Sequence, residues 1–515
     1  MTPQSEPIDL LVIGGGINGA GIARDAAGRG LSVVLCEKGD LAEGTSSRSG
    51  KLVHGGLRYL EYYEFRLVRE ALIEREVLLE AAPHVIWPMR FVLPHSAEQR
   101  PAWLIRAGLL LYDHLGGRRR LPATRSLDLR AAPEGLPLKA DYRRAFEYSD
   151  CWVDDSRLVV LNAMDAAERG AQVLTRTACL SARREDGLWQ VELANPNGGA
   201  RRQLRARALV NAAGPWVEAV LAGVAGVNSE RRVRLVKGSH IVVKKFWEGP
   251  QAYLLQNSDK RVIFVNPYED GLALIGTTDV PYQGAPEAVS IEAAEVDYLI
   301  AVVNRYFKQQ LGPDDVLHDF AGVRPLYDDA AANPSAVTRD YVFDVDPHGA
   351  EDSTRPPLLT IFGGKITTYR KLAEHALDRL AAFLPGVGGA WTAGVALPGG
   401  DLPEADFEAF LADFERARPW LGRDLVQHYA RLYGTRAESL LGEAAAIRDL
   451  GRHFGGLLYE REARYLMDNE WVCGAEDLLQ RRTKHALHLT EIQRERFEAW
   501  LREQLAGERR QGISA

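Results

Sequence analysis

The sequence lacks the features of disulfide-bonded, metal-binding and nucleic-acid-binding proteins. Its 515 residues include only four cysteines, which stand far apart and form no CxxC pair. HExxH and paired-carboxylate motifs are also missing, so we expect a reduced chain without a metal site. The formal net charge is −7, and there is no basic stripe with interleaved aromatic residues. Because phosphate binding needs an excess of Lys and Arg, this composition argues against nucleic acid as a partner.

Long hydrophobic runs are missing too. No stretch approaches the ~18–20 apolar residues that a membrane-spanning helix needs. The first expected strand begins at Ile8 without a basic and then apolar leader, so we expect no secretory signal. Residues 99–120, QRPAWLIRAGLLLYDHLGGRRR, place arginines around a short apolar run with an aromatic anchor. This pattern is typical of a helix that lies on a bilayer surface, and equally of a partly buried helix with a solvated basic end.

The chain divides into three zones by composition. Residues 1–383 mix short β-branched strands, helical stretches and glycine turns, as α/β and α+β domains do. Residues 384–403 are rich in Gly and Pro and are expected to be a linker without regular structure. Residues 404–515 show helical periodicity throughout, which predicts a small helical domain. Its first buried helix face is expected to carry Phe407, Phe410, Leu411 and Phe414.

The N-terminal segment carries a dinucleotide-binding pattern. An apolar strand, Ile8–Ile13, leads into a GxGxxG turn, an Ala-rich helix and a second strand that ends at Glu37. The glycines of the turn are Gly14, Gly16 and Gly19. The first makes the tight turn, the second lets a pyrophosphate approach the backbone, and the third lets helix and strand pack closely. Glu37 stands where a carboxylate accepts hydrogen bonds from ribose hydroxyls, so the full pattern predicts a dinucleotide site.

The next segment, GTSSRSGKLVHGGLRYL from Gly44, favours FAD over NAD. An NAD domain usually continues with another strand and helix, whereas this chain inserts hydroxyl residues, glycines and a histidine. The hydroxyls of Thr45, Ser46 and Ser47 are expected to bond to pyrophosphate or ribityl oxygens. Gly55 and the glycine after it let the backbone lie against a flat ring, before a long helix with one buried face. That face is expected to carry Leu60, Leu67, Ala71 and Leu78.

A second Gly-rich turn stands late in the chain, in LLTIFGGKITTYRK. An apolar strand ends at Gly363 and Gly364, and a helical pattern begins near Ile366. Because strand ends meet at one edge of a sheet, we expect this turn to touch the flavin, with the helix N-terminus stabilising negative charge on the reduced ring. Lys365 is expected to reach the ring or a phosphate, and Thr367 lies in the first helical turn.

Two further positions are expected beside the dinucleotide. Cys179 occupies the stretch where such folds bond the adenine edge through the backbone, and its thiol is expected to be incidental. The strand in ARALVNAAGPWV ends at Gly214, where a small residue permits close approach. Asp154 and Asp155, in CWVDDSR, are interpreted as a helix N-terminal cap rather than a catalytic pair.

Together with EYSDCWVDDSRLV, LVKGSHIVV, IGTTDVPY and AGVRPL, these motifs resemble the FAD-dependent, membrane-associated glycerol-3-phosphate dehydrogenases of aerobic bacteria. That family belongs to the glycine/D-amino-acid oxidase group of flavoproteins, and the resemblance covers almost the whole chain. It implies a Rossmann-like FAD-binding domain, interleaved with an antiparallel-sheet substrate domain at roughly residues 80–150 and 225–345, and a helical C-terminal domain.

The resemblance also implies an activity. It implies oxidation of sn-glycerol 3-phosphate to dihydroxyacetone phosphate, with electrons passed from FAD to a membrane quinone. The expected location is the cytoplasmic face of the cytoplasmic membrane, as a peripheral or monotopic protein, with residues 99–120 as the contact with the bilayer surface. The oligomeric state, a homodimer included, stays open.

This chemistry needs side chains that hold a dianionic phosphate. Guanidinium groups suit phosphate because their planar fork donates twice to one anion. The family resemblance places Arg58, with Tyr59 beside it, and Arg324 in the substrate site, and it favours phosphate as the partner of Lys365.

The hydroxyl proton of the substrate must also be accepted. Histidine is the natural acceptor near neutral pH, and His54 and His240 stand in matched motifs. The sequence does not rank the two, and Arg324 is a third candidate as partner of the developing alkoxide. Thr278, in IGTTD, is expected to line or support the substrate cavity.

Two alternatives remain at this point. An oxidase on the same scaffold would pass electrons to O2, but it has no need of a membrane, so residues 99–120 favour the dehydrogenase. A non-redox FAD-dependent RNA-modifying protein would need a basic surface, which a sequence pI of about 6.0 does not support.

Overall fold

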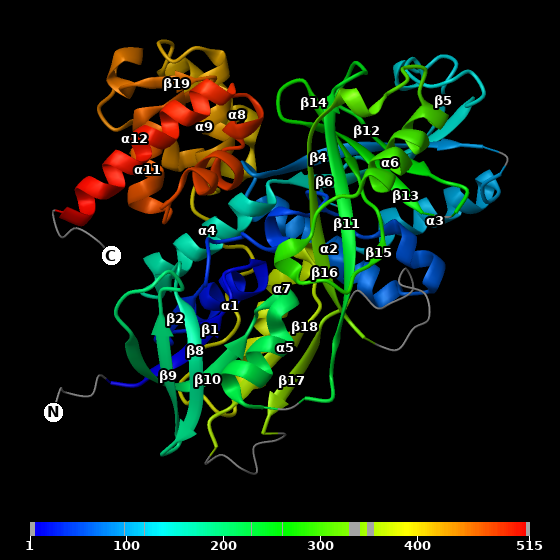
Figure 1. Cartoon of the computed structure of the whole chain (residues 1–515). Helices are drawn as coiled ribbons and strands as arrows, with labels where there is room; N and C mark the ends of the chain where they lie inside the picture. The colour runs from blue at the N-terminus through cyan, green and yellow to red at the C-terminus, as the bar shows by residue number, and fades with distance from the viewer. Residues whose placement is uncertain are drawn as a thin grey trace.

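The computed structural model describes residues 6–96, 98–117, 119–227, 229–259, 261–328, 340–347 and 355–510. Arg118, one of the basic residues in the predicted bilayer segment, lies outside them. The described chain builds two sheets that stand side by side and a helical C-terminal unit against one end of both (Figure 1).

The first sheet has the parallel core of a dinucleotide-binding fold. Its strand order is β17-β18-β10-β1-β2-β7, and β1 runs parallel to both β2 and β10. The strands are β1 (Ile8–Ile13), β2 (Val33–Cys36), β7 (Gln172–Leu174), β10 (Arg202–Asn211), β17 (Val342–Asp346) and β18 (Leu358–Phe362), with β8 (Ala178–Glu185) and β9 (Leu188–Ala194) extending from β10. Helix α1 (Ile17–Gly28) connects β1 to β2 and packs against α4 (Asp155–Glu168) and α7 (Tyr369–Leu380). The predicted first strand is confirmed at both ends.

The second sheet is mainly antiparallel and is inserted between elements of the first. Its order is β15-β11-β14-β13-β12-β4-β6-β3, with β16 beside β11 and β5 beside β6. The strands are β3 (Leu52–Val53), β4 (Ile86–His95), β5 (Arg125–Asp128), β6 (Arg144–Val153), β11 (Val233–Lys244), β12 (Ala252–Gln256), β13 (Val262–Tyr268), β14 (Leu272–Gly276), β15 (Val280–Pro281) and β16 (Val316–Tyr327). Helix α6 (Ala293–Tyr306) buries Leu299 and Val303 in the core of this sheet. The interleaving that the family resemblance implied is therefore present.

Helix α2 (Phe65–Ala81) begins later than the sequence pattern suggested. Leu67, Ala71 and Leu78 are buried on it as predicted, but Leu60 lies in a separate 3-10 turn, Leu57–Tyr62. Tyr63 ends that turn in the left-handed region, at φ 60°, so the backbone cannot continue as one helix.

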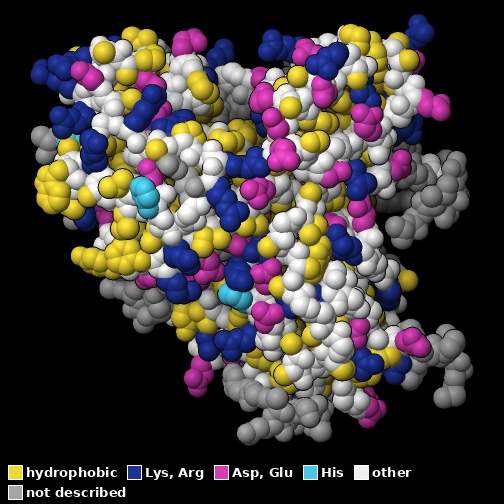
Figure 2. All heavy atoms as spheres, turned by 180° about the vertical axis from the view of Figure 1, so that it is seen from behind, with side chains coloured by type: hydrophobic (Ala, Val, Ile, Leu, Met, Phe, Trp, Pro, Cys, Tyr) yellow, Lys and Arg dark blue, Asp and Glu magenta, His cyan; other side chains and the backbone are white. Residues whose placement is uncertain are grey.

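Helix α3 (Ala102–Leu115) is the element predicted from residues 99–120. Leu109 and Tyr112 are buried, whereas Trp103 is 71% exposed and Leu110 is 60% exposed. Figure 2, seen from behind, shows hydrophobic side chains gathered at the left edge of the molecule, where α3 and the start of α2 lie. No helix among the described residues is long and apolar enough to cross a membrane.

The segment predicted as a linker contains no helix or strand between Leu380 and Pro403. It is nevertheless packed, because Leu384 and Leu397 belong to the core of the first sheet. Trp391 lies under the guanidinium of Arg169, whose carbon is 4.0 Å from the ring centroid. The segment that leads to the C-terminal domain is therefore packed against the first sheet and its helices.

The C-terminal domain is helical with one exception. Its helices are α8 (Phe407–Ala417), α9 (Arg423–Tyr433), α10 (Ala437–Leu441), α11 (Glu460–Asn469) and α12 (Glu491–Arg510). A short hairpin, β19 (His453–Gly455) and β20 (Leu458–Tyr459), differs from the helical prediction, because Gly455 and Gly456 both take positive φ. On α8, Phe407 and Phe414 are buried and Phe410 and Leu411 are half-buried.

Candidate active site

A cavity of about 1230 Å³ lies where the two sheets meet, and both sheets contribute to its wall. From the first sheet come the turns after β1, β2, β10 and β18; from the second come β11, β13, β14 and β16. Most predicted site residues therefore meet in one place. The predicted residues that do not line it are Gly19, Ser47, Gly55 and Thr278.

The glycines after β1 have different roles. A Cβ on Gly14, at φ 114°, would stand 2.6 Å from the Ala212 carbonyl oxygen, and one on Gly19 would stand 1.9 Å from the Gly14 carbonyl oxygen. These two glycines therefore allow strand and helix to pack. Gly16 lines the cavity, and a Cβ there would have only the Ser46 hydroxyl close by, at 3.1 Å. The N-terminus of α1 thus opens into the cavity with the space that a phosphate needs.

Glu37 follows directly after β2 and lines the cavity. Its carboxylate accepts the N–H groups of Gly15, at 2.7 Å, and Gly39, at 2.8 Å. Burial raises the pKa of this carboxyl, and the two N–H groups oppose the rise. Cys179 lies on the same wall, and burial raises the pKa of its thiol to about 12, so this side chain is unreactive.

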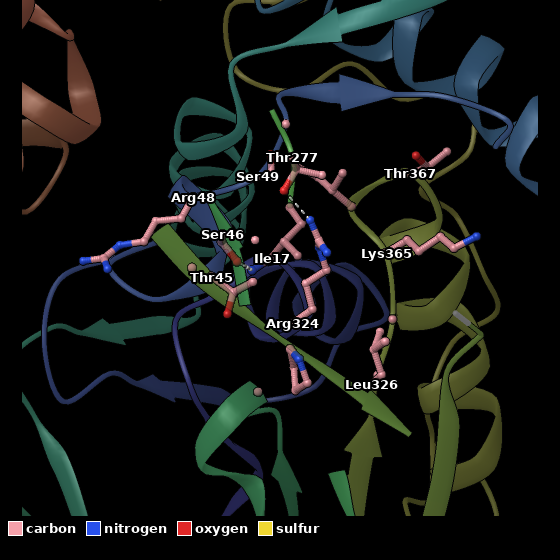
Figure 3. A pocket seen from close by; sticks show the side chains of 18 of the residues that line it. Ile17, Thr45, Ser46, Arg48, Ser49, Thr277, Arg324, Leu326, Lys365 and Thr367 are labelled. Atoms are coloured by element: carbon pink, nitrogen blue, oxygen red, sulfur yellow. Dashed lines mark hydrogen bonds between the residues drawn. The ribbon is translucent and has the colours of Figure 1, made fainter. Parts of the chain in front are cut away.

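The three hydroxyl residues after Gly44 make contacts within the protein. Ser46 Oγ accepts the Ile17 N–H at 3.0 Å, as Figure 3 shows, and Thr45 Oγ1 donates to the Val323 carbonyl at 2.7 Å. Both residues line the cavity, whereas Ser47 lies behind it, and its carbonyl accepts from Lys51 at 3.2 Å. The turn is therefore held in place from both sheets.

The glycine turn after β18 contacts the start of the helix that follows the glycine turn after β1. Gly363 and Gly364 have φ values of 79° and 104°, which a side chain rarely permits. The Gly363 carbonyl accepts from Asn18 Nδ2 at 3.3 Å, and a Cβ on Gly364 would come within 3.0 Å of the same nitrogen. Thr367 Oγ1 accepts the His54 N–H at 3.2 Å. This turn thus joins the start of α1 to the loop that carries His54, and the helix behind it begins as a 3-10 turn at Ile366–Thr368.

Cationic side chains reach the cavity from two directions. Arg324, on β16, pairs with Asp279 and donates to Thr277 Oγ1 at 2.7 Å. Lys365 extends away from Arg324 in Figure 3, and its ammonium lies 3.9 Å from the centre of the Tyr59 ring. Arg58 lines the same cavity. The three predicted phosphate ligands therefore share one cavity without forming a single cluster.

His240, on β11, is the more deeply buried of the two candidate proton acceptors, with 3% of its surface exposed. Its ring stacks on Phe320 at 4.8 Å, and neither ring nitrogen has a hydrogen-bond partner within the described part of the chain. Burial, followed by the charges of Arg324 and Lys51, lowers the pKa of His240 to about 3. His54 also lines the cavity and is half-buried, with its ring edge toward Phe264.

Two predicted residues lie one layer behind the wall. Thr278 is 1% exposed; its hydroxyl accepts the Ser239 N–H at 3.0 Å and donates to Glu295 at 2.7 Å. Gly55 is buried, and its N–H donates to Asp150 at 3.3 Å. Gly214, by contrast, lines the cavity at φ 56°.

Asn18 and Asn266 were not predicted as site residues. Both line the cavity, and the side-chain oxygen of each is buried without a hydrogen-bond partner among the described residues. Asn18 could have been found, because it stands in the first turn of the helix after GxGxxG. Asn266, on β13, gives no such signal in the sequence.

These observations fit a bound dinucleotide. A cradle that only glycine permits, an open helix N-terminus, a carboxylate after β2 and unpartnered polar atoms all face one cavity. Fold and site together define a flavoprotein of the oxidoreductase class.

Comparison with known families supports this class. Residues 9–370 match the family model described as FAD dependent oxidoreductase, and residues 390–500 match the C-terminal domain of alpha-glycerophosphate oxidase. The chain belongs to the FAD-dependent oxidoreductase family, and within it to the group of the glycerol-3-phosphate dehydrogenases, as the resemblance in the sequence indicated.

Three relatives illustrate the similarity. D-erythritol 1-phosphate dehydrogenase of Brucella abortus is 63% identical over 96% of this chain and 98% of its own. Aerobic glycerol-3-phosphate dehydrogenase of Escherichia coli is 53% identical over 96% of this chain and 97% of its own. The structure of glycerol-3-phosphate dehydrogenase from Bacillus halodurans, complexed with FAD, superposes with a TM-score of 0.77 at 30% identity, over 98% of this chain and 92% of that one.

Proposed function

We propose that this chain uses FAD to oxidise the secondary hydroxyl of sn-glycerol 3-phosphate, giving dihydroxyacetone phosphate. One observation carries the proposal: cations suited to a phosphate share a single cavity with a dinucleotide-binding turn and two histidines. The cations are Arg58, Arg324 and Lys365. Relatives that are more than half identical over nearly the full chain are named glycerol-3-phosphate dehydrogenases, which supports the same substrate.

Each group then has a physical task. Bound FAD supplies the ring that accepts a hydride. Arg324 is aligned by Asp279 and Thr277, so its guanidinium can face the phosphate or the developing alkoxide without reorganising. His240 is neutral at physiological pH, because its pKa lies far below 7, so one ring nitrogen carries a proton and the other can accept the hydroxyl proton; neither has a hydrogen-bond partner among the described residues. His54 is the competing acceptor.

Anaerobic mixing with sn-glycerol 3-phosphate tests the reaction directly. We expect the flavin absorbance to bleach within the mixing experiment and the product to form in a one-to-one ratio to FAD. Unphosphorylated glycerol serves as the matched control, since it offers the same hydroxyl without the anion. Bleaching at the same rate with both compounds would contradict a phosphate-binding site.

D-Erythritol 1-phosphate is a second candidate substrate. It is the substrate in the name of a relative that is 63% identical, above the 55% of a relative named for glycerol 3-phosphate. It carries one more hydroxymethylene group, which a cavity of about 1230 Å³ has room to hold beside a flavin. The ratio of kcat/KM for the two phosphates, measured on one preparation, decides between them.

We also propose that the electrons go to a membrane quinone and that α3 contacts the bilayer at the cytoplasmic face. Trp103, Leu110 and Leu111 are exposed on α3, and Leu111 also lines the cavity. An apolar helix with arginines nearby is the composition that binds an anionic lipid surface, and a bilayer contact through this helix would bring the cavity beside the lipid. This supports a lipid-soluble acceptor.

An oxidase would use O2 in place of the quinone. Oxygen consumption and reduction of a quinone analogue, measured at equal substrate concentration, separate the two. We expect the quinone rate to exceed the oxygen rate, and equal rates would assign the chain to the oxidases.

A further inference from the structure

Two arginines of the C-terminal domain form ion pairs with the turn that carries Glu37. Arg482 donates to both carboxylate oxygens of Asp40, at 2.6 and 2.8 Å, and Arg481 donates to the same carboxylate at 2.6 Å. Asp40 and Arg482 are fully buried. Asp40 does not line the cavity, but it follows Gly39, whose N–H donates to the Glu37 carboxylate. The position of Glu37 is therefore set in part by the other domain.

The same short segment holds a second turn of the cavity. Lys484 forms a buried ion pair with Asp154, the residue that caps the N-terminus of α4. The next residue, Asp155, accepts from Ser49 Oγ and from Lys51 Nζ, both at 2.7 Å. Ser49 lines the cavity, in the turn that also carries Thr45 and Ser46, and Ser46 accepts the Ile17 N–H at the start of α1. Residues 481–484 thus reach two cavity-lining turns through one buried layer of charges.

We propose that residues 481–484 of the C-terminal domain position the FAD site. They act through Asp40 on the turn of residues 37–40, which is the ribose-facing turn, and through Asp154 on the Thr45–Ser49 turn. Buried charges of opposite sign impose one geometry, because a displaced partner leaves an uncompensated charge in a low dielectric. A site held this way stays within the few tenths of an ångström that cofactor binding requires. The segment touches no substrate and acts only through the turns.

The test compares two variants that each remove one buried charge. Asp40→Asn disturbs the ribose-facing turn. Glu74→Gln disturbs the buried pair between Glu74 on α2 and Arg370 on α7, whose atoms lie 2.6 Å apart, and neither residue lines the cavity or pairs with residues 481–484. Both variants are purified as full chains, stripped of FAD and titrated with FAD while flavin fluorescence and the melting temperature are recorded.

We expect Asp40→Asn to raise the dissociation constant of FAD about 10-fold or more, as the loss of one charge-assisted hydrogen bond does. Glu74→Gln should lower the melting temperature by a similar amount without changing FAD binding. At saturating FAD, kcat and the KM for the phosphate substrate of Asp40→Asn should return to the wild-type values, because the reacting atoms lie at the other end of the cavity.

If both variants had a lower melting temperature and unchanged FAD binding, the proposal would be overturned, and the segment would only stabilise the contact between the domains. Arg481→Lys covers the case in which Asp40→Asn does not fold, since it keeps the charge and removes the directed bonds of the guanidinium, to Asp40 and also to Asp477 and Glu476 within the C-terminal domain. It should weaken FAD binding by roughly 3-fold, the lower end for a hydrogen bond, and no weakening would also overturn the proposal.

Discussion

Arg324 enters the cavity with its guanidinium aligned by two neighbours, so its replacement tests the phosphate contact. Arg324→Lys keeps the charge but loses the planar fork, and we expect kcat/KM for the phosphate substrate to fall roughly 10- to 150-fold, with the FAD content unchanged. Arg48→Lys is the matched control: Arg48 is another arginine of the cavity wall, and its side chain points away from Arg324 in Figure 3. Equal losses in both variants would argue against a specific role for Arg324.

His240 links the active site to acid stability. Its pKa is about 3 in the folded chain against a usual value near 6.5, so the unfolded chain binds the proton first as the pH falls. The histidine therefore reduces stability progressively between pH 6.5 and 3, with a slope of up to about 1.4 kcal/mol per pH unit. Above pH 6.5 it has no such effect.

His240→Gln should consequently flatten the decline of the melting temperature between pH 6.5 and 4, measured by circular dichroism in buffers of constant ionic strength. His114→Gln, at an exposed position on α3, is the control and should leave the curve unchanged. His84, with a pKa also lowered to about 3 by burial, accounts for part of the decline that remains. An unaltered curve for His240→Gln would contradict the buried, neutral histidine.

At the scale of elements, the turn after β1 allows FAD binding to be weakened without a large change in the unfolding free energy. Gly16 has φ −82°, which alanine adopts freely, and an added Cβ meets only the Ser46 hydroxyl at 3.1 Å. Gly16→Ala should change the unfolding free energy of the FAD-free chain by less than about 1 kcal/mol, since Ser46 can shift slightly. FAD binding should weaken strongly, because the methyl group fills the space for the pyrophosphate.

Urea unfolding of the FAD-free chain and an FAD titration supply the two readouts. Gly223→Ala, at a position with open space and no positive φ, is the control and should affect neither. Intact FAD binding in Gly16→Ala would show that the phosphates lie elsewhere.

Helix α3 allows membrane binding to be tested apart from the chemistry at the cavity. Replacing Trp103 and Leu110 by Ser should move the enzyme to the soluble fraction and reduce its quinone rate, while its rate with a soluble dye survives because neither residue lines the cavity. Leu109 must be kept, because it is fully buried and its replacement would damage the core. Leu317 and Ile492, exposed to 53% and 61% on other elements, provide the matched control. Retention of the double variant in the membrane pellet would place the anchor elsewhere.

The sequence predicted the glycine turns well because their reasons are local. Strand β1 ends where predicted, since an apolar run meets a glycine that must take φ 114°. The directions of single side chains depended on distant partners instead: Thr278 turns toward Glu295 and Gly55 toward Asp150. No local pattern announces such contacts, so Ser47, Gly55 and Thr278 were expected at the cavity and lie behind it. The start of α2 was placed too early for a related reason, the left-handed Tyr63.

At the scale of the whole molecule, buried ion pairs join the C-terminal domain to the first sheet. Arg157 pairs with Glu470 and Arg482 with Asp40, and all four side chains are almost fully buried. Separation of the domains would leave these charges unpaired in a low dielectric, which costs several kcal/mol. We therefore expect one cooperative transition in differential scanning calorimetry of the FAD-loaded chain. Two resolved transitions, one of them insensitive to FAD, would show that the C-terminal domain unfolds on its own.

The contact between Asn18 and Gly363 has a consequence for how the protein is made. The two residues are 345 positions apart, and Asp40 and its partner Arg482 are 442 positions apart. At a synthesis rate of about 5–20 residues per second, the ribosome needs roughly 20 to 90 s to supply Arg482 after Asp40 has emerged. Throughout that interval the nascent chain presents a glycine turn and an apolar strand edge without their partners, which is the state that chaperones bind. We therefore expect FAD to bind only after nearly the whole chain has been made.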